Sequence, residues 1–421
     1  MRSSTPPRFL FRSACPFAFA GALALFAVAT AAVAAEPYYE PITLERVLAL
    51  PASEQRPWLE YLARSEKNFA IEKEFRANEA RAARIPDLKL APYATVFGVN
   101  LDQPIAWFAT PEGRRITANV LSYQTPTGGW SKRLDLGKEP RAPGTDFVSE
   151  HNAHYEGTFD NDSTTTQMRA VARAFQATGN AAARDSFLRG LNYVFISQYP
   201  NGGWPQIYPI EGGYHDAIPY NDDAVTNVLT LLRDVAAGGP DFDFVPPALR
   251  REAGERAQRG IACVLASQIR VEGKLTGWCQ QHDALTLKPC AARAFEPAGI
   301  CSAESASVMH FLIDLPNPSP AVVAAVKGVG EWLKKTAVRD FAWKNTPDNG
   351  RMLVPEAGAG PLWSRIYEVG TDKPIFGGPN YSVLYDVNTV TRERRGGYNW
   401  YPNSPARHLA AYDLWLKQRG G

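Results

Sequence analysis

The string QTPTGGW at residues 124–130 recurs as QYPNGGW at residues 198–204. The final residues of the two strings, Trp130 and Trp204, are 74 residues apart, and the same interval again leads to Trp278 in GKLTGWCQQ at residues 273–281. A fixed period of this length is typical of a fold built from repeated structural units. Gly permits a tight turn and Trp supplies a large area to bury, so the motif predicts a turn anchored by an aromatic side chain.

Each period contains two stretches in which apolar residues recur at helical spacing. The pairs are residues 163–180 with 181–198, 221–239 with 246–269, and 302–315 with 319–337. We therefore expect a fold dominated by α-helices, an (α/α)3 toroid of helix-pair repeats of about 74 residues with long loops. The alternative is an open helical array, or solenoid. We favour the ring because the units are few and a solenoid would require atypical capping repeats at its ends.

The first residues predict a secretory signal peptide over 1–35. Three arginines precede the apolar run at residues 15–34, which ends in small residues. We therefore expect an exported protein, periplasmic or extracellular. A charged stretch at 52–85 predicts an N-terminal helical extension over residues 36–111, and residues 112–421 would form the toroid domain. The part beyond about residue 340 is rich in loops and aromatic residues, and we expect it to lie across one face of the ring.

The charge balance excludes some partners. The chain has 45 Lys and Arg against 43 Asp and Glu, and loss of the signal peptide removes three arginines. No clustered basic face indicates nucleic acid binding, and we expect a monomer without membrane association after cleavage. Four cysteines remain in an exported chain and can form disulfides in any of three pairings: Cys263, Cys279, Cys290 and Cys301.

The first helix of each pair starts beside polar residues, in FDNDSTTT at 159–166, YNDDAVTN at 220–227 and CSAESASV at 301–308. Helix capping explains about half of these acids. In a ring, however, equivalent helix starts converge, so these oxygen-bearing side chains would gather in one place. Carboxylate and amide oxygens are ligands that Ca²⁺ prefers. The polar residues are Asp160, Asn161, Asp162, Asn221, Asp222, Asp223 and Glu304.

Two cations stand near these motifs. Arg293 lies between Cys290 and Cys301 just before Glu304, and Lys132 directly follows the first Gly-Gly-Trp. Either could be an ordinary ion-pairing or solvated charge. Their positions also suit a site for an anionic substrate. A helical ring with acids, bases and many aromatic residues indicates an enzyme that acts on polysaccharides.

Eight strings taken together resemble the family 10 pectate lyases. They run in order over roughly residues 112–402: SYQTPTGGWSK, TFDNDSTTTQMRAVARAF, QYPNGGWPQIYP, YNDDAVTNVL, WCQQHDALTLKPCAARAFE, SAESASV, LWSRIYEVGTDKPIF and ERRGGYNWY. The resemblance implies an (α/α) toroid. It also implies calcium-dependent β-elimination of polygalacturonate, the implied substrate, to 4,5-unsaturated products.

The resemblance also implies roles for six residues. Arg293 matches the family's proposed base, and Asp160 with Asp222 look like acids on the calcium side. Asn161, Lys132 and Arg365 resemble substrate-binding residues. An arginine base has a pKa above about 12, so we expect an alkaline optimum.

The chain departs from the family pattern at three points. Ser131 stands where the family usually has Pro, and Asp162 where a small residue is expected. No Arg stands near Pro379, where the resemblance places one that contacts substrate. This last departure puts one subsite, and the preferred substrate, in question.

Two other functions remain open from the sequence. An inverting glycoside hydrolase would use two of Asp160, Asp222 and Glu304 as acid and base and would not need Arg293. A non-catalytic uronate-binding protein would keep the groove and lose turnover. Replacing Arg293 with Ala separates the three, because the change should abolish elimination, leave hydrolysis intact and only weaken simple binding.

Overall fold

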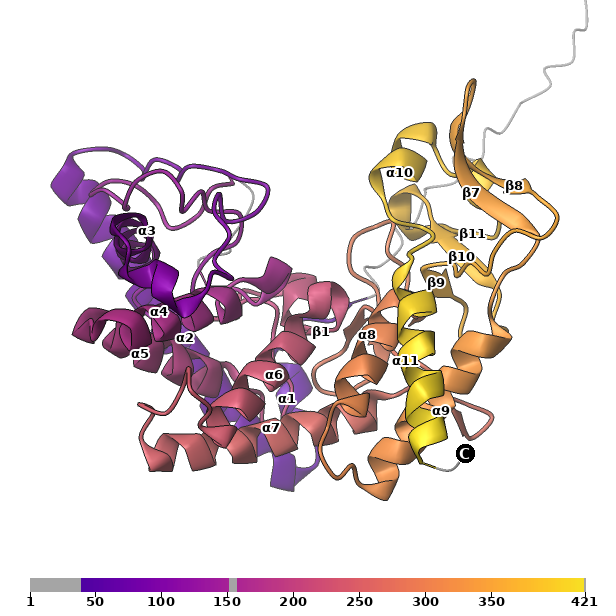
Figure 1. Cartoon of the computed structure of the whole chain (residues 1–421), viewed down its shortest axis with the longest axis horizontal. Helices are drawn as coiled ribbons and strands as arrows, with labels where there is room; N and C mark the ends of the chain where they lie inside the picture. The colour runs from indigo at the N-terminus through magenta and orange to yellow at the C-terminus, as the bar shows by residue number, and fades with distance from the viewer. Residues whose placement is uncertain (1–38, 151–156, 420–421) are drawn as a thin grey trace, which may run out of the picture. The chain divides into compact units, whose positions relative to one another are not determined.

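The computed structural model describes residues 39–150 and 157–419, in which helices dominate (Figure 1). The α-helices are α1 Leu44–Leu48, α2 Ala52–Ala83, α3 Pro111–Ser122, α4 Thr165–Thr178, α5 Ala181–Ser197, α6 Ala224–Ala237, α7 Pro247–Ser267, α8 Ser302–Ile313, α9 Pro320–Lys335, α10 Arg392–Gly397 and α11 Ser404–Gln418. The short 3-10 helices are η1 Ile105–Ala109, η2 Asp160–Asp162, η3 Gly213–Asp216, η4 Asn221–Asp223, η5 Pro379–Tyr381 and η6 Val387–Thr389. The expected helical fold is confirmed, and the predicted signal peptide lies outside the described residues.

Four small antiparallel sheets connect the helices. One has the order β1 Ile218–Pro219, β4 Gln281–His282, β5 Pro289–Cys290, and another the order β11 Val383–Leu384, β10 Pro374–Gly377, β9 Ile366–Tyr367, β6 Ile300–Cys301. Two hairpins pair β2 Arg270–Val271 with β3 Lys274–Leu275, and β7 Phe341–Thr346 with β8 Gly350–Pro355. The first sheet matters for the site because β1 leads into η4, and β4 and β5 hold the loop that follows Trp278.

The three tryptophans of the repeated motif are fully buried, and each makes a hydrogen bond of the same kind. Each indole N–H donates to a backbone carbonyl in the helix that precedes its motif. The pairs are Trp130 with Val120 in α3 at 2.8 Å, Trp204 with Val194 in α5 at 2.9 Å, and Trp278 with Val264 in α7 at 2.8 Å. Each tryptophan therefore fixes the turn onto the helix from which the chain has just emerged.

The glutamines that open the motifs fix the same turns to the next helix pair. Each side-chain amide donates once within its own turn and once to a carbonyl of a later helix. Gln124 binds Gly128 and Ser186 of α5, Gln198 binds Gly202 and Arg256 of α7, and Gln268 binds Thr276 and Ala325 of α9. Each motif is thus bonded to the helix before it and to the second helix of the pair after it.

Glycine is required where two of these turns approach a neighbouring helix. Gly128 has φ +107° and Gly202 has φ +97°, a region that residues with a Cβ rarely adopt. A Cβ at Gly202 would stand 2.3 Å from the carbonyl oxygen of Arg259, and one at Gly128 would stand 2.6 Å from that of Arg189. The close approach of turn and helix explains why both strings have glycine at this position.

The first helices of the pairs lie next to one another. Helix α6 packs against both α4 and α8, and the turns η2 and η4 that precede α4 and α6 are in contact. Asn161 in η2 and Asp222 in η4 both adopt left-handed backbone conformations, with φ of 49° and 50°. Asn and Asp tolerate this conformation better than most residues, so the polar sequence of these turns suits their shape.

The N-terminal segment packs on the same hydrophobic core as the helix pairs. Trp58 and Tyr61 of α2 are buried, and their ring centroids lie 5.1 and 4.9 Å from that of Tyr199, in the second motif. The charged stretch at 52–85 does form a helix, α2, as its sequence predicts. The segment that contains it contributes buried residues to the main core.

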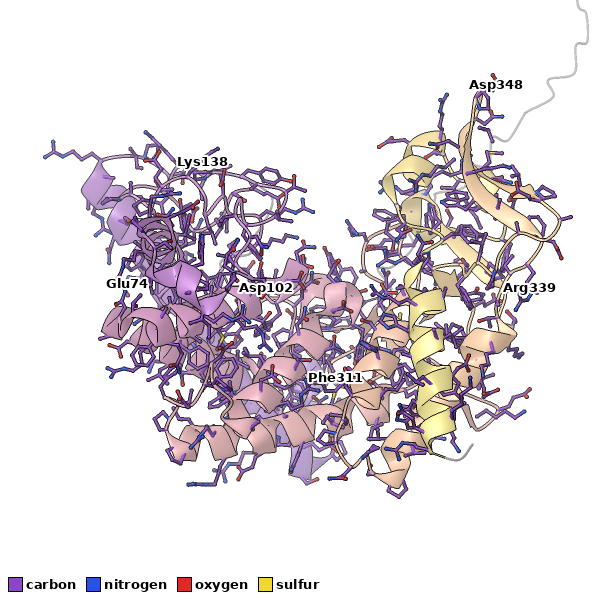
Figure 2. The ribbon with its side chains drawn as sticks, in the orientation of Figure 1. Glu74, Asp102, Lys138, Phe311, Arg339 and Asp348 are labelled. Atoms are coloured by element: carbon purple, nitrogen blue, oxygen red, sulfur yellow. The ribbon has the colours of Figure 1, made fainter. Side chains whose placement is uncertain are left out.

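The C-terminal part is more regular than its sequence suggested. It forms strands β7 to β11 and two helices, and α11 packs against α8 and α9. Figure 2 shows Asp348 at the tip of the β7–β8 hairpin and Phe311 within α8. Turn-forming residues dominate this part of the sequence, which concealed the short strands and the amphipathic face of α11.

The remaining four cysteines are free thiols, and all four are buried. The disulfides that an exported chain could form are therefore not present in this structure. Among the described residues, no helix combines the length and apolar character that a bilayer crossing requires.

Candidate active site

A cavity of about 290 Å³ gathers all six residues singled out from the sequence. They come from separate segments: a motif turn, η2, η4, the loop between β5 and β6, and the residue just before β9. The six are Lys132, Asp160, Asn161, Asp222, Arg293 and Arg365. Of the other polar residues at helix starts, Asn221 also lines this cavity, Glu304 lies behind it on Arg365, and Asp162 and Asp223 line a neighbouring cavity.

The acidic side of the cavity is built by η2 and η4. Asp160 is buried, and its Oδ2 accepts a hydrogen bond from Lys132 Nζ at 2.6 Å. Asp160 Oδ1 is also buried and has no hydrogen-bond partner among the described residues. Desolvation by the surrounding protein and the nearby Asp160 carboxylate raise the pKa of Asp222 to about 6. Two carboxylates this close repel each other, which favours a cation or a shared proton between them.

Amide side chains orient the second of these acids. Gln281 donates through Nε2 to Asn221 Oδ1 at 2.7 Å, and Asn221 Nδ2 donates to Asp222 Oδ2 at 2.9 Å. The Oε1 atoms of Gln206 and Gln281 are buried and unpartnered among the residues that the structure describes. Carboxylate and amide oxygens therefore point to one region from three segments of the chain.

Arg293 stands on the opposite side of the cavity and is held by a carboxylate that sequence reasoning missed. Its Nη2 and Nε donate to the two oxygens of Glu296 at 2.6 and 2.8 Å. The hydrogen bonds to Glu296 raise the pKa of Arg293 above its already high value. About half of the Arg293 side chain remains exposed, whereas Glu296 is buried and also accepts from Tyr398 Oη at 3.2 Å.

Arg365, like Lys132, is a largely enclosed cation of the site. Its Nη2 donates to the buried Glu304 carboxylate at 2.5 Å, and its guanidinium lies 4.8 Å from the centroid of the Tyr398 ring. With the Gln280 amide oxygen turned toward Arg365, that oxygen accepts from Nη2 at 2.9 Å and from Nε at 3.1 Å. This packing fixes the direction in which the guanidinium presents its remaining N–H groups.

The residues missed from the sequence are contacts of these cations, Glu296, Gln280 and Tyr398, and the partner of Asn221, Gln281. Each lies in a string that resembles the family, Glu296 at the end of ARAFE and Tyr398 in RRGGYNWY. The strings could have pointed to them. Their contacts could not be foreseen, because Tyr398 is more than one hundred residues from Glu296 along the chain. The segment around Pro379, which lacks the expected Arg, does not line the cavity.

Within residues 39–150 and 157–419, no three His, Cys, Asp or Glu side chains are grouped so as to hold a metal ion. The acid pair Asp160 and Asp222 would need amide, water or substrate oxygens to complete a coordination shell, as Ca²⁺ sites commonly use.

Comparison with known proteins identifies the family. Residues 124–409 match the family model described as pectic acid lyase. A family 10 polysaccharide lyase from Cellvibrio cellulosa is similar in structure, with a TM-score of 0.65 and 30% identity, over 76% of this chain and 99% of that chain. A mutant of that enzyme in complex with trigalacturonic acid matches equally well, over 75% of this chain and 98% of that chain. No curated protein matches the chain.

The match covers most of the chain and includes all six residues of the cavity. These findings confirm the resemblance drawn from the eight strings, and with it the enzymatic class. The chain therefore belongs to the pectic acid lyase family and is a polysaccharide lyase.

Proposed function

We propose that this protein is a secreted, calcium-dependent pectate lyase that cleaves α-1,4-polygalacturonate by β-elimination to 4,5-unsaturated oligogalacturonides. The observation that carries the proposal is the cavity in which an acid pair faces three cations, Lys132, Arg293 and Arg365. A related lyase has been solved with trigalacturonic acid, which supports a polygalacturonate substrate.

The cations would bind the carboxylates of the substrate. Arg365 presents a planar fork that suits a carboxylate, and its contacts with Glu304 and Tyr398 hold that fork in place. Lys132 donates a hydrogen bond to Asp160 in this structure. A substrate carboxylate would therefore compete with Asp160 for Lys132, and a cation would compete with Lys132 for Asp160. Asn161, on the left-handed turn of η2, would hydrogen-bond the sugar unit beside the acid pair.

The acid pair fits a calcium ion. Asp160 Oδ1 is a buried carboxylate oxygen without a partner among the described residues, and burial, together with the neighbouring Asp160 carboxylate, raises the pKa of Asp222. Asp160 and Asp222 would hold the ion, with amide oxygens nearby. Bound there, Ca²⁺ would neutralise a substrate carboxylate and stabilise the negative charge that develops during elimination.

Arg293 would act as the base. In the elimination, the C5–H bond breaks and its proton passes to Arg293, the C4–C5 double bond forms, and the C4–O4 bond to the leaving chain breaks. The bonds to Glu296 use Nε and Nη2, so Nη1 is the nitrogen outside this ion pair. Because Glu296 stabilises the charged guanidinium, the neutral base forms only at high pH, and we expect activity to be highest in alkaline solution.

The wider architecture supports this proposal. We infer that the helix pairs form an (α/α)3 toroid with repeats of about 74 residues, supported by the recurring bonds of the three motifs. We further infer a signal peptide over residues 1–35, an extension over 36–111 and a catalytic toroid over 112–421. Export to the periplasm or medium, as a monomer, follows from the signal sequence and the balanced charge.

The first test is ultraviolet absorbance of polygalacturonate treated with the enzyme at alkaline pH, with calcium and then with a chelator. We expect a rise in absorbance that the chelator stops and that added calcium restores. A rise that persists in chelator would remove the calcium requirement, and the absence of a rise under any condition would overturn the proposed activity.

Replacing Arg293 with Ala tests its role as base. We expect kcat to fall by about 10³-fold, because general-base catalysis contributes about 10²–10⁴-fold. Arg270→Ala, at an exposed arginine on the β2–β3 hairpin, is the matched control and should leave kcat unchanged. An Arg293→Ala enzyme that still releases reducing ends without a double bond would instead indicate hydrolysis.

A further inference from the structure

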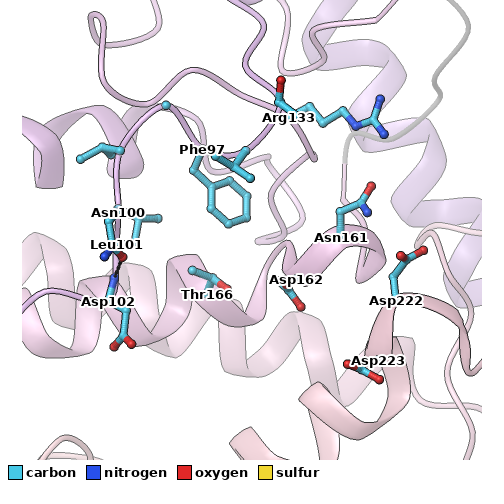
Figure 3. A pocket seen from close by; sticks show the side chains of 14 residues that line it. Phe97, Asn100, Leu101, Asp102, Arg133, Asn161, Asp162, Thr166, Asp222 and Asp223 are labelled. Carbon is cyan, nitrogen blue, oxygen red and sulfur yellow. Dashed lines mark hydrogen bonds between the residues drawn. The ribbon is translucent and has the colours of Figure 1, made fainter. Parts of the chain in front are cut away.

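A second cavity of about 780 Å³ adjoins the active site and shares Arg133, Asn161 and Asp222 with it (Figure 3). Its volume lies within the range of about 300–1,000 Å³ common for ligand pockets. One side is formed by residues 95–102. This segment precedes residue 124, where the match to the family begins, so the second cavity has a wall outside the matched region.

The wall formed by residues 95–102 carries apolar side chains through its middle, and the polar Asn100 and Asp102 lie toward its end. Val96 is 69% exposed, while Phe97 and Val99 rest against the main core and Leu101 is buried. Figure 3 shows the Phe97 ring directed into the space between this wall and the turn that carries Asn161. An exposed aromatic face beside a cavity offers a flat apolar surface to a bound ring.

Backbone hydrogen bonds hold this wall in place. Ala94 N donates to Arg133 O at 3.0 Å, Leu136 N donates to Phe97 O at 2.9 Å, and Asp102 N donates to Asn100 Oδ1 at 2.8 Å. The segment is therefore tied to the chain that follows the first motif. The apolar face is preformed and requires no ordering when a ligand binds.

The charges on the second cavity are unlike those of the active site. Among its described lining residues, the only cationic side chain is Arg133, and it is paired with Glu150 at 3.1 Å. The acidic lining residues are Asp102, Asp162, Asp222 and Asp223. Asp102 is in turn paired with Arg173 at 2.7 Å, and Asp222 would be engaged by a cation, so Asp162 and Asp223 are the lining acids for which the described residues provide no ion pair. An ionised galacturonate unit would therefore meet like charge here and no free cation.

We propose that the second cavity is a subsite for an uncharged unit of the substrate chain, either a methyl-esterified galacturonate or a neutral sugar. The inference rests on the proposed lyase function and specifies its substrate. An ionised unit occupies the cation-rich active site, and an adjoining unit without charge packs against Phe97. Specificity arises from both the apolar wall and the acids that repel an ionised unit.

Kinetics on three substrates test the proposal: polygalacturonate, partly methyl-esterified homogalacturonan, and a polymer in which galacturonate alternates with a neutral sugar. We expect Phe97→Ala to lower kcat/KM on at least one of the last two about tenfold more than on polygalacturonate, mainly through KM. The substrate that responds identifies the source of the uncharged unit. Phe69→Ala, at an aromatic residue on α2 that is 41% exposed, is the matched control and should not alter these ratios.

Phe97→Leu guards against a folding defect, because it keeps an apolar side chain and removes only the aromatic face. We expect an intermediate loss of selectivity. Equal losses of kcat/KM on all three substrates in both variants would overturn the proposal. If the unaltered enzyme forms no unsaturated product from any substrate, the proposed lyase function itself has failed, which is a distinct result.

The acidic wall is tested separately with Asp162→Asn. Asp162 accepts a hydrogen bond from the amide of Asn227 at 2.7 Å, and Asp243 accepts one from Gln176 at 2.5 Å outside both cavities. We expect Asp162→Asn to lower KM for polygalacturonate roughly threefold, since a repelling charge is removed, and Asp243→Asn to leave it unchanged. A higher KM in Asp162→Asn would show that the wall attracts ionised units and would contradict the proposal.

Discussion

Two cations of the active site are each held by a buried carboxylate, one three residues away along the chain and the other 61 residues away. Arg293 is held by Glu296, and Arg365 by Glu304. Both ion pairs join a buried carboxylate to a cation that lines the cavity. Removing the charge of Glu296 should therefore change the pKa of Arg293, which gives a test at a single residue.

Glu296→Gln tests whether Arg293 is the base. The bonds to Glu296 raise the pKa of Arg293, so their weakening lowers that pKa and makes the neutral form available at lower pH. We expect the limb of the kcat profile that rises with pH, which reports deprotonation of the base, to move to lower pH by about one unit. Glu356→Gln, at an exposed acid paired with Lys344, is the control. A profile that stays in place would assign proton removal to another group.

His282 predicts how the fold responds to acid. Its Nε2 accepts from Cys279 N at 2.9 Å and its Nδ1 donates to Leu287 O at 2.8 Å, so both nitrogens suit the neutral ring. Burial lowers the pKa of His282 to about 4. The unfolded chain therefore binds a proton between pH 6.5 and about 4 that the folded chain does not, and stability should fall as pH decreases through this window.

The measurement is the free energy of unfolding as a function of pH. The contribution of His282 has a slope of up to about 1.4 kcal/mol per pH unit. His282→Gln should flatten the pH dependence of the free energy of unfolding in this window. If the curve of His282→Gln keeps the slope of the unaltered protein, His282 does not govern the response to acid.

Among the elements, the repeated turns are what connect one helix pair to the next. The Gln and Trp of each motif hydrogen-bond to helices on either side, and the Gly between them passes close to a carbonyl of a neighbouring helix. A turn that meets all of these demands tolerates little change. The sequence repeats the motif because the same junction recurs.

Gly202→Ala tests this junction. The new Cβ would stand 2.3 Å from Arg259 O, and the backbone has φ of +97°. We expect the free energy of unfolding to fall by at least about 2 kcal/mol from strain and overlap. Gly239→Ala, where no atom lies within 4 Å of the new Cβ, is the matched control and should change stability little. Equal effects of the two changes, measured by denaturant unfolding, would refute the close approach.

In the molecule as a whole, the N-terminal segment and the helix pairs share one core. Trp58 and Tyr61 of α2 belong to the main hydrophobic cluster together with Tyr199 and Trp204. Residues 95–102 meanwhile form a wall beside the active site. The segment outside the family match is therefore part of both the core and the surroundings of the site.

Trp58→Ala tests this shared core. Truncating a buried tryptophan costs about 3–5 kcal/mol, and we expect a loss of that size in a single cooperative transition that also includes the helix pairs. Phe69→Ala, on the same helix but partly exposed, should cost much less. A separate early transition, with the remainder unfolding as before, would show that α2 is an independent unit.

Local chemistry made the helix pairs, the repeated turns and the six site residues predictable from the sequence. Apolar periodicity, Gly-Gly-Trp turns and polar helix starts act over a few residues, and each appears in the string itself. The family resemblance then pointed to residues that the structure gathers in one cavity. The strands after residue 340 were missed because their segments are short and lie among turn residues, and helix α11 was missed although it runs for 15 residues.

The contacts between distant segments were set by three-dimensional packing. Glu296 and Tyr398 meet across 102 positions, and Trp58 meets Tyr199 from a segment that the sequence presented as an extension. All four cysteines are free thiols in the folded chain, which their even number did not reveal. The sequence carries the local preferences of each element, whereas the charge, burial and partners of the active site arise only when segments far apart in the chain share the same space.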